Sequence, residues 1–555
     1  MTILRPQSAY GEAPPPQTPY SVVTNIPKWE TCHRFREGDM SVVKGLKHIY
    51  PRRGPTHYVT ELGKAIAGKL GIEGKECFLY LNPEMWPYTD RHVSDPHRGD
   101  SQFDPSLLER RCVDVAGHRL YAVFFPPEKT PGMILSWGNP GVGLSIRGAE
   151  QLLQGIGTMK EVEFKEGEVP EPTWTPESPG HEALKERVST LVNRAPHSAQ
   201  TAVATSPSDV FVYPTGMSAI WHSSRHTLEY RPGSIVVLGV VFHNTYHHFL
   251  DEAPHGFKHV PKVDAAGLAD FEKYLDDQAA LNQTVSYVLV EVPGNPTCDT
   301  VDTKRLKRLS EKHGFVLVAD DTLSGFGNID VLPWCDILMT SLTKSFSGYA
   351  NVMGGSIVLN PKGQHYTQLK SLVAEKHRNE YFAIDAEVLL ANSQDFFSRT
   401  VVLNHNANAA ATFLQSKIDS DPDCVLTKVR YPSLMPSKHL YDDLMRGPTE
   451  EIPHPGYGCL MNLEFEDLDA AIAFHDNCGF YASPHLGAHV TIQFAYSMVV
   501  FGKKPDERAY FSDVGSKEES VRVSVGLEKT NDILETLEFA LEKAKALKKL
   551  GYKEQ

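Results

Sequence analysis

Between about residues 182 and 400, short apolar runs alternate with stretches of helical periodicity. The runs at 285–293, 315–321 and 334–344 have the length of buried strands, and an amphipathic helix at 303–314 separates the first two. Strands that alternate with helices predict a mainly parallel sheet with helices on both faces. This feature predicts a large α/β domain at 182–400.

The pattern changes after residue 400. A long helical stretch occupies 401–418, strand-like runs occupy 458–467 and 521–528, and a last helix begins at Asn531. We therefore expect a second, smaller α+β domain at 401–555.

The chain before residue 182 has a different composition. Residues 1–30 are rich in proline and predict a flexible arm. Residues 31–181 predict an N-terminal extension with an amphipathic helix at 58–70, and 160–181 is an acidic, proline-rich insertion that has no apolar face to bury.

Charge and cysteine content exclude several classes of protein. The net charge of −14 argues against a nucleic acid or a membrane surface as a partner. The chain contains no uncharged apolar run of about 18 residues that would cross a bilayer. Its 8 cysteines are dispersed without a CxxC pair, so we expect no metal site and no disulfide framework, and a cytoplasmic location.

Polar residues follow two of the predicted strands, at the edge where parallel sheets bind ligands. Lys344, in 340–355, has an amine that can form a Schiff base if its pKa is lowered, although a surface lysine would fit the same pattern. Asp320, in 316–322, ends an apolar strand and would pair with a ring nitrogen or act as a structural aspartate; its neighbour Asp321 is expected to be structural.

A third strand end lies in VFVYPTGMSAI, residues 210–220. Gly216 and Met217 open a helix there, and backbone N–H groups at a helix start bind phosphate. Junctions of this kind are common, so the motif is weak by itself. Together, the three strand ends predict one site with a phosphate cradle, an acidic partner for a ring, and a lysine.

The order and spacing of these motifs resemble those of the Cys/Met-metabolism family of enzymes dependent on pyridoxal 5'-phosphate (PLP). The resemblance is carried by EVPGNPTCDT (291–300), VADDT (318–322), SLTKSFSGYANVMGG (341–355) and, more loosely, VRVSVGLEKTNDILETLEFAL (521–541). The motif PTGMSAI and the long region before residue 200 resemble those of the fungal-type cystathionine gamma-synthases. The resemblance implies an aminotransferase-like fold (fold type I).

The resemblance also implies roles for individual residues. Lys344 would form the Schiff base with PLP and carry protons. Asp320 would pair with the pyridine nitrogen, and Asn295 would lie near the ring hydroxyl and the substrate carboxylate. Arg522 would bind the substrate α-carboxylate through two hydrogen bonds. The expected phosphate ligands are Gly216, Met217, Ser341 and Thr343.

The chain departs from the family pattern at two positions that would face the ligand. Phe242 takes the place of a tyrosine that stacks on the cofactor, with Tyr246 as an alternative source of the lost hydroxyl. His485 replaces a serine in a Ser-Leu-Gly turn; it and His489 would either line the pocket or be ordinary loop residues.

A Tyr-x-Arg motif of the family normally reaches the phosphate from a neighbouring subunit. Tyr50 and Arg52 fit this motif, and Arg147 is the alternative. The shared site would imply a homodimer or homotetramer.

We expect γ-replacement on O-acetyl-L-homoserine, with cysteine giving cystathionine, or with another nucleophile such as a carbon acid in a specialised pathway. A PLP-dependent γ- or β-lyase is one alternative. A PLP-binding scaffold without activity is another, although Lys344, Asp320 and Arg522 argue against it.

Overall fold

The computed structural model describes residues 2–165 and 167–552, and its largest sheet has seven strands in the order β5-β11-β10-β9-β8-β6-β7. Neighbouring strands from β10 to β7 are parallel, and β11 is antiparallel to both β10 and β5. The prediction of an α/β domain with a mainly parallel sheet is confirmed. The strands are β5 (Val210–Tyr213), β6 (Ser234–Leu238), β7 (Phe257–Val260), β8 (Val285–Glu291), β9 (Val316–Asp320), β10 (Ile337–Thr340) and β11 (Gly355–Leu359).

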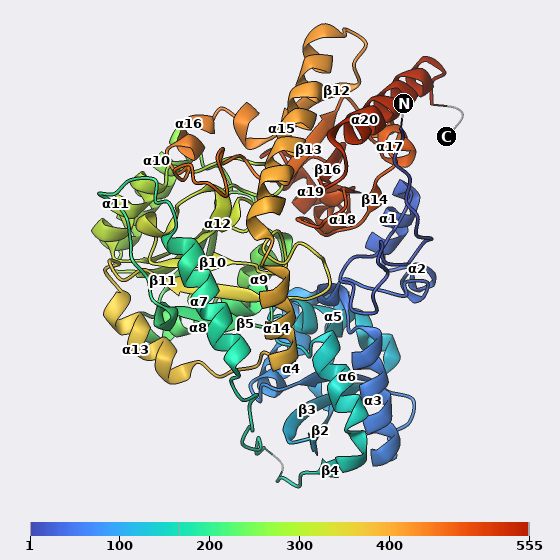
Figure 1. Cartoon of the computed structure of the whole chain (residues 1–555). Coiled ribbons are helices and arrows are strands. Elements are labelled where there is room, and N and C mark those ends of the chain that lie inside the picture. The colour runs from blue at the N-terminus through green and yellow to red at the C-terminus, as the bar shows by residue number, and fades with distance from the viewer. Residues whose placement is uncertain (1, 166, 553–555) are drawn as a thin grey trace.

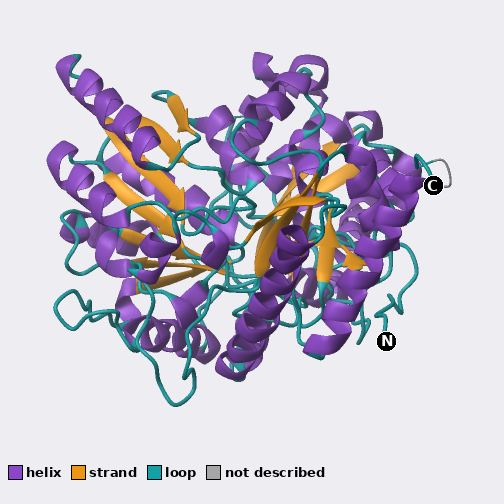
Figure 2. Cartoon of the chain, turned by 90° about the horizontal axis from the view of Figure 1, so that it is seen from above, coloured by secondary structure: helices purple, strands orange, loops and turns teal. Residues whose placement is uncertain are grey.

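Helices cover both faces of this sheet, as Figures 1 and 2 show. Side chains of β8 alternate between the faces: Val288 and Val290 belong to one apolar core, and Tyr287 and Leu289 to the other. Both faces are buried, and this explains why the strands are continuous apolar runs. The helices are α7 (Pro179–Asn193), α8 (Gly216–Tyr230), α9 (His243–Glu252), α10 (Ala265–Ala280), α11 (Thr303–His313), α12 (Gly325–Asn328), α13 (Tyr366–Lys376) and α14 (Ala383–Asn392).

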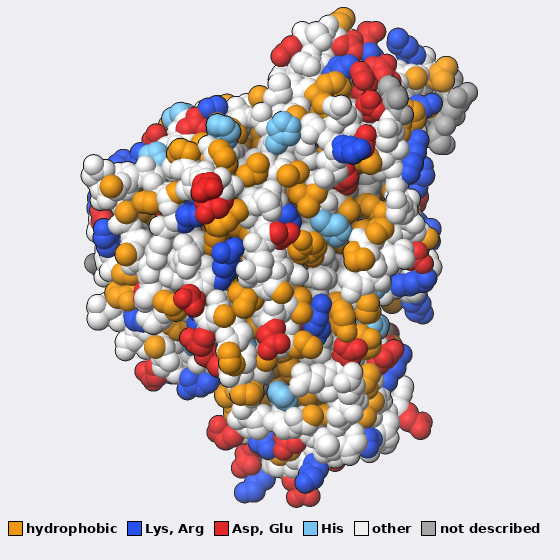
Figure 3. All heavy atoms as spheres, in the orientation of Figure 1, with side chains coloured by type: hydrophobic (Ala, Val, Ile, Leu, Met, Phe, Trp, Pro, Cys, Tyr) orange, Lys and Arg blue, Asp and Glu red, His pale blue; other side chains and the backbone are white. Residues whose placement is uncertain are grey.

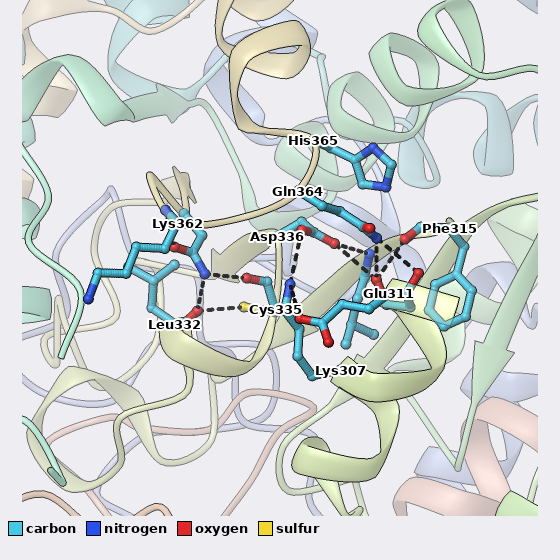
Figure 4. A network of polar contacts seen from close by, with 12 residues as sticks. Lys307, Glu311, Phe315, Leu332, Cys335, Asp336, Lys362, Gln364 and His365 are labelled. Carbon is cyan, nitrogen blue, oxygen red and sulfur yellow. Dashed lines mark hydrogen bonds and ion pairs between the residues drawn. The ribbon is translucent and has the colours of Figure 1, made fainter. Parts of the chain in front are cut away.

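A buried polar network ties the amino ends of β9 and β10 together (Figure 4). Asp336 directly precedes β10 and accepts a hydrogen bond from the backbone N–H of Leu317 at 2.9 Å. Its other carboxylate oxygen lies 3.5 Å from the amine of Lys307 in α11. The network fixes the register in which Met339 lies beside Asp320, and so positions the polar residues at the opposite ends of these strands.

The smaller C-terminal domain has a five-stranded sheet in the order β12-β13-β16-β15-β14, antiparallel except for the pair β14 and β15. This confirms the α+β prediction. The long helix α15 begins at Phe396, just before the predicted boundary, and continues into this domain. The elements are α15 (Phe396–Ser420), β12 (Leu426–Arg430), α16 (Lys438–Asp442), β13 (Leu460–Phe465), α17 (Leu468–Asn477), β14 (Tyr481–Ala482), β15 (Ile492–Phe494), α18 (Tyr496–Phe501), α19 (Pro505–Ser512), β16 (Ser520–Ser524) and α20 (Thr530–Lys549).

The residues from α3 (His57–Leu70) to β4 (Lys160–Glu161) form a third unit, seen as the lower lobe in Figure 1, for which the sequence predicted no fold. The helix that precedes this lobe, Trp29–Arg36, packs on the C-terminal domain, where Trp29 and Cys32 join the apolar core. Its antiparallel sheet has the order β1-β3-β2-β4. Helix α3 coincides with the helix predicted at 58–70. The elements of the N-terminal region, including the two helices before this lobe, are α1 (Trp29–Arg36), α2 (Met40–Lys44), α3 (His57–Leu70), β1 (Glu76–Tyr80), α4 (Met85–Ser94), β2 (Glu109–Val115), β3 (His118–Phe125), α5 (Thr130–Gly138), α6 (Ile146–Gln154) and β4 (Lys160–Glu161).

Eight short 3-10 helices connect these elements within the described residues. They are η1 (Pro51–Arg53), η2 (Pro96–Ser101), η3 (Pro105–Leu107), η4 (Pro127–Lys129), η5 (Ile156–Thr158), η6 (Pro207–Asp209), η7 (Leu332–Trp334) and η8 (Pro432–Leu434).

The segment expected to be a flexible arm packs across the body of the protein. The backbone N–H of Val22 donates to the carbonyl of Ala350 at 2.8 Å, and that of Ile26 donates to Ala482 at 2.7 Å. Both side chains are buried. The prolines suggested a mobile arm, but the run from Val22 to Ile26 has apolar side chains to bury and backbone groups that pair with the core.

The outer surface mixes charges of both signs. On the face in Figure 3, Lys and Arg side chains are interspersed with Asp and Glu. No helix in the described part of the chain has the length and apolarity that a membrane span needs.

Candidate functional site

A cavity lies where the carboxyl ends of β8, β9 and β10 meet the start of α8. This is the edge of a parallel sheet at which ligands bind. Among its lining residues are Tyr50, Gly216, Met217, Phe242, Glu291, Asn295, Asp320, Ser341, Thr343, Lys344 and Arg522. The fold thus brings together nearly every residue that the sequence singled out.

Lys344 lies in the turn after β10, with its side chain buried. Its amine Nζ is 2.9 Å from the hydroxyl of Tyr50 and 3.3 Å from Nδ1 of His485. The amine also lies 4.6 Å from the centre of the Tyr50 ring. A lysine held in this way is not the surface residue that the strand end also allowed.

Two buried carboxyl groups lie side by side at the ends of β8 and β9. Asp320 is paired with Glu291 in the sheet, and its Oδ1 accepts the backbone N–H of Thr322 at 2.8 Å. Burial raises the pKa of Asp320 to about 6. Burial, and then the charge of Asp320, raise the pKa of Glu291 well above its ordinary value. A cationic ring nitrogen beside these carboxyl groups would favour their ionised forms.

Glu291 was missed as a site residue, although it stands in the quoted motif EVPGNP. Its Oε1 accepts the backbone N–H of Phe242 at 2.6 Å. Asp321 instead accepts a hydrogen bond from the hydroxyl of Thr340 at 2.6 Å, in keeping with the structural role predicted for it.

The first turn of α8 has the geometry of a phosphate cradle. Thr215 caps the helix by accepting the backbone N–H of Ser218 at 2.9 Å. A Cβ atom on Gly216 would lie 2.9 Å from Cβ of Ser341, so only glycine fits this close approach. The hydroxyl of Thr343 is used differently from the prediction: it donates to the carbonyl of Gly354 at 3.1 Å and accepts its N–H at 3.0 Å.

Arg522 projects into the cavity from β16 and is buried. Its guanidinium donates to Oδ1 of Asn295 at 3.1 Å and to the carbonyl of Pro484 at 2.8 Å. It also lies 3.9 Å from the centre of the Tyr496 ring. A buried guanidinium bound only to neutral groups in these contacts retains the charge needed to bind a carboxylate.

Phe242 and Tyr246 have different positions relative to the cavity. Phe242 lines the cavity. Tyr246 packs among His259 and Phe511, with ring centres about 5 Å away, and is not among the cavity residues. The hydroxyl that the family places on this side of the cofactor is therefore not restored by Tyr246.

Tyr50 reaches the amine of Lys344 within one chain, whereas the resemblance predicted that it approaches the phosphate from a second subunit. The segment before it crosses the loop that follows Lys344, so the chain itself delivers the tyrosine. The side chain of Arg52 lies outside the described part of the structure. The next residue, Arg53, was not predicted; its Nη2 is buried and has no hydrogen-bond partner in the described residues.

Two other candidates lie outside the cavity. Arg147 donates to the carbonyl of Asn351 at 2.7 Å and lies 3.5 Å from Asp385, a structural position. Nε2 of His489 contacts the carbonyl of Pro15 at 2.9 Å. By contrast, His485 on the same loop is buried against Lys344.

These groups fit PLP. The amine would bind its aldehyde, the paired carboxyl groups would face a ring nitrogen, and the close approach at Gly216 leaves backbone N–H groups open to a phosphate. In the described residues, no cluster of three or more His, Cys, Asp or Glu side chains could hold a metal ion.

Comparisons with known proteins agree with this geometry. A family model described as "Cys/Met metabolism PLP-dependent enzyme" matches residues 186–542. An alanine racemase of Aspergillus violaceofuscus is 29% identical over 97% of this chain and 97% of its own length. A cystathionine gamma-synthase-like enzyme of Amanita muscaria is 27% identical over 97% and 96%. The cystathionine gamma-synthase of Neurospora crassa is 31% identical over 60% of this chain and 52% of its own length.

Solved structures match the fold. Cystathionine gamma-synthase of Xanthomonas oryzae aligns with a TM-score of 0.53 at 22% identity, covering 69% of this chain and 91% of its own. A cystathionine gamma-lyase from yeast aligns with a TM-score of 0.53 at 24% identity, with the same coverage. Both likenesses bear out the fold type I architecture, and the match of the family model to more than half of the sequence shows that this chain belongs to the Cys/Met-metabolism family of PLP-dependent enzymes.

Proposed function

We propose that this enzyme catalyses γ-replacement on O-acetyl-L-homoserine, in which acetate leaves Cγ and a nucleophile takes its place. The observation that carries the proposal is a buried amine and a buried guanidinium in one cavity, Lys344 and Arg522. The guanidinium suits the α-carboxylate of an amino acid, and the amine suits proton transfer at its carbon atoms.

Each residue has a defined task in this proposal. Arg522, held by Asn295, orients the α-carboxylate. Nζ of Lys344 takes the Cα proton and later moves protons at Cβ. The hydroxyl of Tyr50 accepts a hydrogen bond from that nitrogen, and Nδ1 of His485 lies 3.3 Å from it. Asp320 would hold the ring nitrogen of PLP in its protonated form. Bound PLP supplies the electron sink that makes the Cα proton acidic.

Two classes of nucleophile are compatible with the proposed reaction. Cysteine would give cystathionine, and a carbon acid would give a new C–C bond. Two features favour a nucleophile other than cysteine. First, Phe242 and His485 replace residues typical of the family. Second, a cystathionine gamma-synthase-like enzyme matches nearly the whole chain, whereas the Neurospora synthase matches only part of it.

A racemase is the second candidate, because one such relative spans nearly the whole chain. Exchange of the Cα proton from both faces commonly uses two separated proton carriers. Here Tyr50 and His485 both lie within hydrogen-bonding distance of the same Lys344 nitrogen. Because both residues contact the same amine, we expect Lys344 to carry the proton alone, and this favours γ-replacement over racemisation.

The deciding experiment offers O-acetyl-L-homoserine to the PLP-loaded enzyme with a panel of thiols and β-keto acids, and identifies the products by mass spectrometry. The proposal expects a γ-substituted amino acid and acetate in equal amounts. Ammonia and a keto acid without a second substrate would identify a lyase. D-alanine formed from L-alanine in a parallel incubation would identify a racemase, and no spectral change on adding amino acids would identify a scaffold.

We also propose a cytosolic location, where reduced thiols are maintained. All 8 cysteines are free in the structure.

A further inference from the structure

The loop that carries His485 is fixed against the residues around Lys344. Gly487 has a φ of +71°, and a Cβ atom there would lie 2.5 Å from the backbone nitrogen of Ser345. The N–H of Gly487 donates to the hydroxyl of Ser524 at 2.9 Å. Arg522 donates to the carbonyl of Pro484 at 2.8 Å and to that of His485 at 3.3 Å. The imidazole position is therefore set by backbone contacts on both sides.

The imidazole is buried, with only 1% of the residue exposed, and its two nitrogens have different surroundings. Nδ1 lies 3.3 Å from Nζ of Lys344. Nε2 has no hydrogen-bond partner in the described residues. The buried ring thus presents one nitrogen to the amine of Lys344, in a position set by the contacts of its loop.

The charges around the ring favour a neutral imidazole. Burial, followed by the charges of Lys344 and Arg522, lowers the pKa of His485 well below its ordinary value. A neutral ring has one acceptor nitrogen, and the amine facing Nδ1 is a donor, so the proton belongs on Nε2. The other ionisable groups near the ring or lining the same cavity are Tyr50, Asp320, Glu291 and His489.

We propose that His485 is the positioning partner of the catalytic amine: its Nδ1 accepts a hydrogen bond from Lys344, stabilises the ammonium form, and sets the pH at which the amine gives up its proton. This inference rests on the role of Lys344 in the proposed function and deepens it. Tyr50 supplies a further contact to the amine, and a serine at 485, as in the family pattern, has a shorter side chain with which to reach it.

The test measures how fast cofactor-free protein takes up added pyridoxal phosphate, followed by absorbance, as a function of pH. Only the neutral amine attacks the aldehyde, so the midpoint of the rate profile reports the pKa of Lys344. In His485→Phe and His485→Ser we expect this midpoint to fall by roughly one pH unit, because the ammonium loses an acceptor. His485→Asn retains an acceptor and should stay near the wild-type midpoint.

His489→Asn is the matched control, because it changes a histidine of the same loop that contacts Pro15 and not Lys344. Unchanged midpoints in both His485→Phe and His485→Ser would overturn the inference, and so would an equal shift in His489→Asn. The measurement requires no turnover, so an enzyme that fails to use O-acetyl-L-homoserine would refute the proposed function without affecting this result.

If neither acceptor-deleted variant folds, the 15N shift of Nδ1 in histidine-labelled, cofactor-free wild type is compared with that in Lys344→Ala. We expect an unprotonated Nδ1 whose shift changes when the amine is removed. An Nδ1 that carries a proton, or that does not respond to Lys344→Ala, would overturn the inference.

Discussion

The hydroxyl of Tyr50 lies 2.9 Å from the amine of Lys344, although 294 positions separate the two residues in the sequence. The contact forms within one chain. It depends on the N-terminal segment, whose Val22 pairs with Ala350 in the loop that follows Lys344. Each chain therefore holds its own tyrosine and its own lysine in one site.

A complementation experiment tests this arrangement. Tyr50→Phe and Lys344→Ala are co-expressed with different tags, and any mixed oligomer is purified and assayed. We expect no recovery of activity, because no site in the mixture would contain both the tyrosine and the lysine. If subunits exchanged their tyrosines, each purified mixed two-fold dimer would regain one of its two sites, which is half of the wild-type number. Such recovery would show that Tyr50 acts in the neighbouring subunit.

Gly216→Ala is expected to weaken PLP binding about tenfold or more, because the new methyl group would lie 2.9 Å from Cβ of Ser341. Overpacking of this kind costs about 1–3 kcal/mol and would displace the start of α8. Titration of cofactor-free protein with PLP, followed by fluorescence, measures the effect.

The matched control is Gly68→Ala in α3, where nothing lies within 4 Å of an added Cβ atom. This change should leave PLP affinity unaltered and stabilise the helix by up to about 1 kcal/mol. Equal affinities in the two variants would contradict the cradle assigned to Gly216.

The sequence predicted the part of the site that lies on consecutive strands. Asp320 ends β9 and Lys344 lies in the turn after β10. These strands are neighbours in the sheet, so local patterns and the parallel topology were sufficient to bring the two residues together. Gly216 was predictable for the same reason, since it opens the helix after β5.

The remainder depended on contacts that sequence patterns do not encode. The prolines of residues 1–30 suggested a mobile arm, but the packing of Val22 and Ile26 against distant segments orders this region. The position of Tyr50 follows from that packing. Thr343 fits the phosphate motif, but its hydroxyl donates a hydrogen bond to the carbonyl of Gly354. This contact depends on the path of the chain after Lys344, which the sequence motif does not specify.

The pH dependence of stability in cofactor-free protein should report on Asp320. Burial raises its folded-state pKa from 3.8 to about 6, so the folded state binds the proton more tightly than the unfolded state. Stability from this group is therefore present at low pH and lost as the pH rises between about 4 and 6, by about 2–3 kcal/mol. Urea unfolding at pH 4 and pH 7 measures the loss.

Asp320→Asn removes this titrating group, so the unfolding free energy of the variant should depend less on pH than that of the wild type. The PLP-loaded variant should also lose activity, because an amide cannot hold a ring nitrogen protonated. Identical pH dependence in the two proteins would mean that Asp320 titrates normally.

Arg522→Lys is expected to raise KM for the amino-acid substrate strongly and to change kcat less. Lysine retains the charge, but it lacks the planar fork that donates to Asn295 and Pro484 and that would bind both carboxylate oxygens. A loss of about 2–3 kcal/mol corresponds to a KM increase of roughly 30- to 150-fold. Steady-state kinetics with varied O-acetyl-L-homoserine and a saturating nucleophile measures this increase in KM.

Arg147→Lys makes the same exchange at a buried arginine outside the cavity, where the substrate KM should stay near the wild-type value. If Arg522→Lys lowered kcat with an unchanged KM, the guanidinium would act on the reacting atoms and not on the carboxylate.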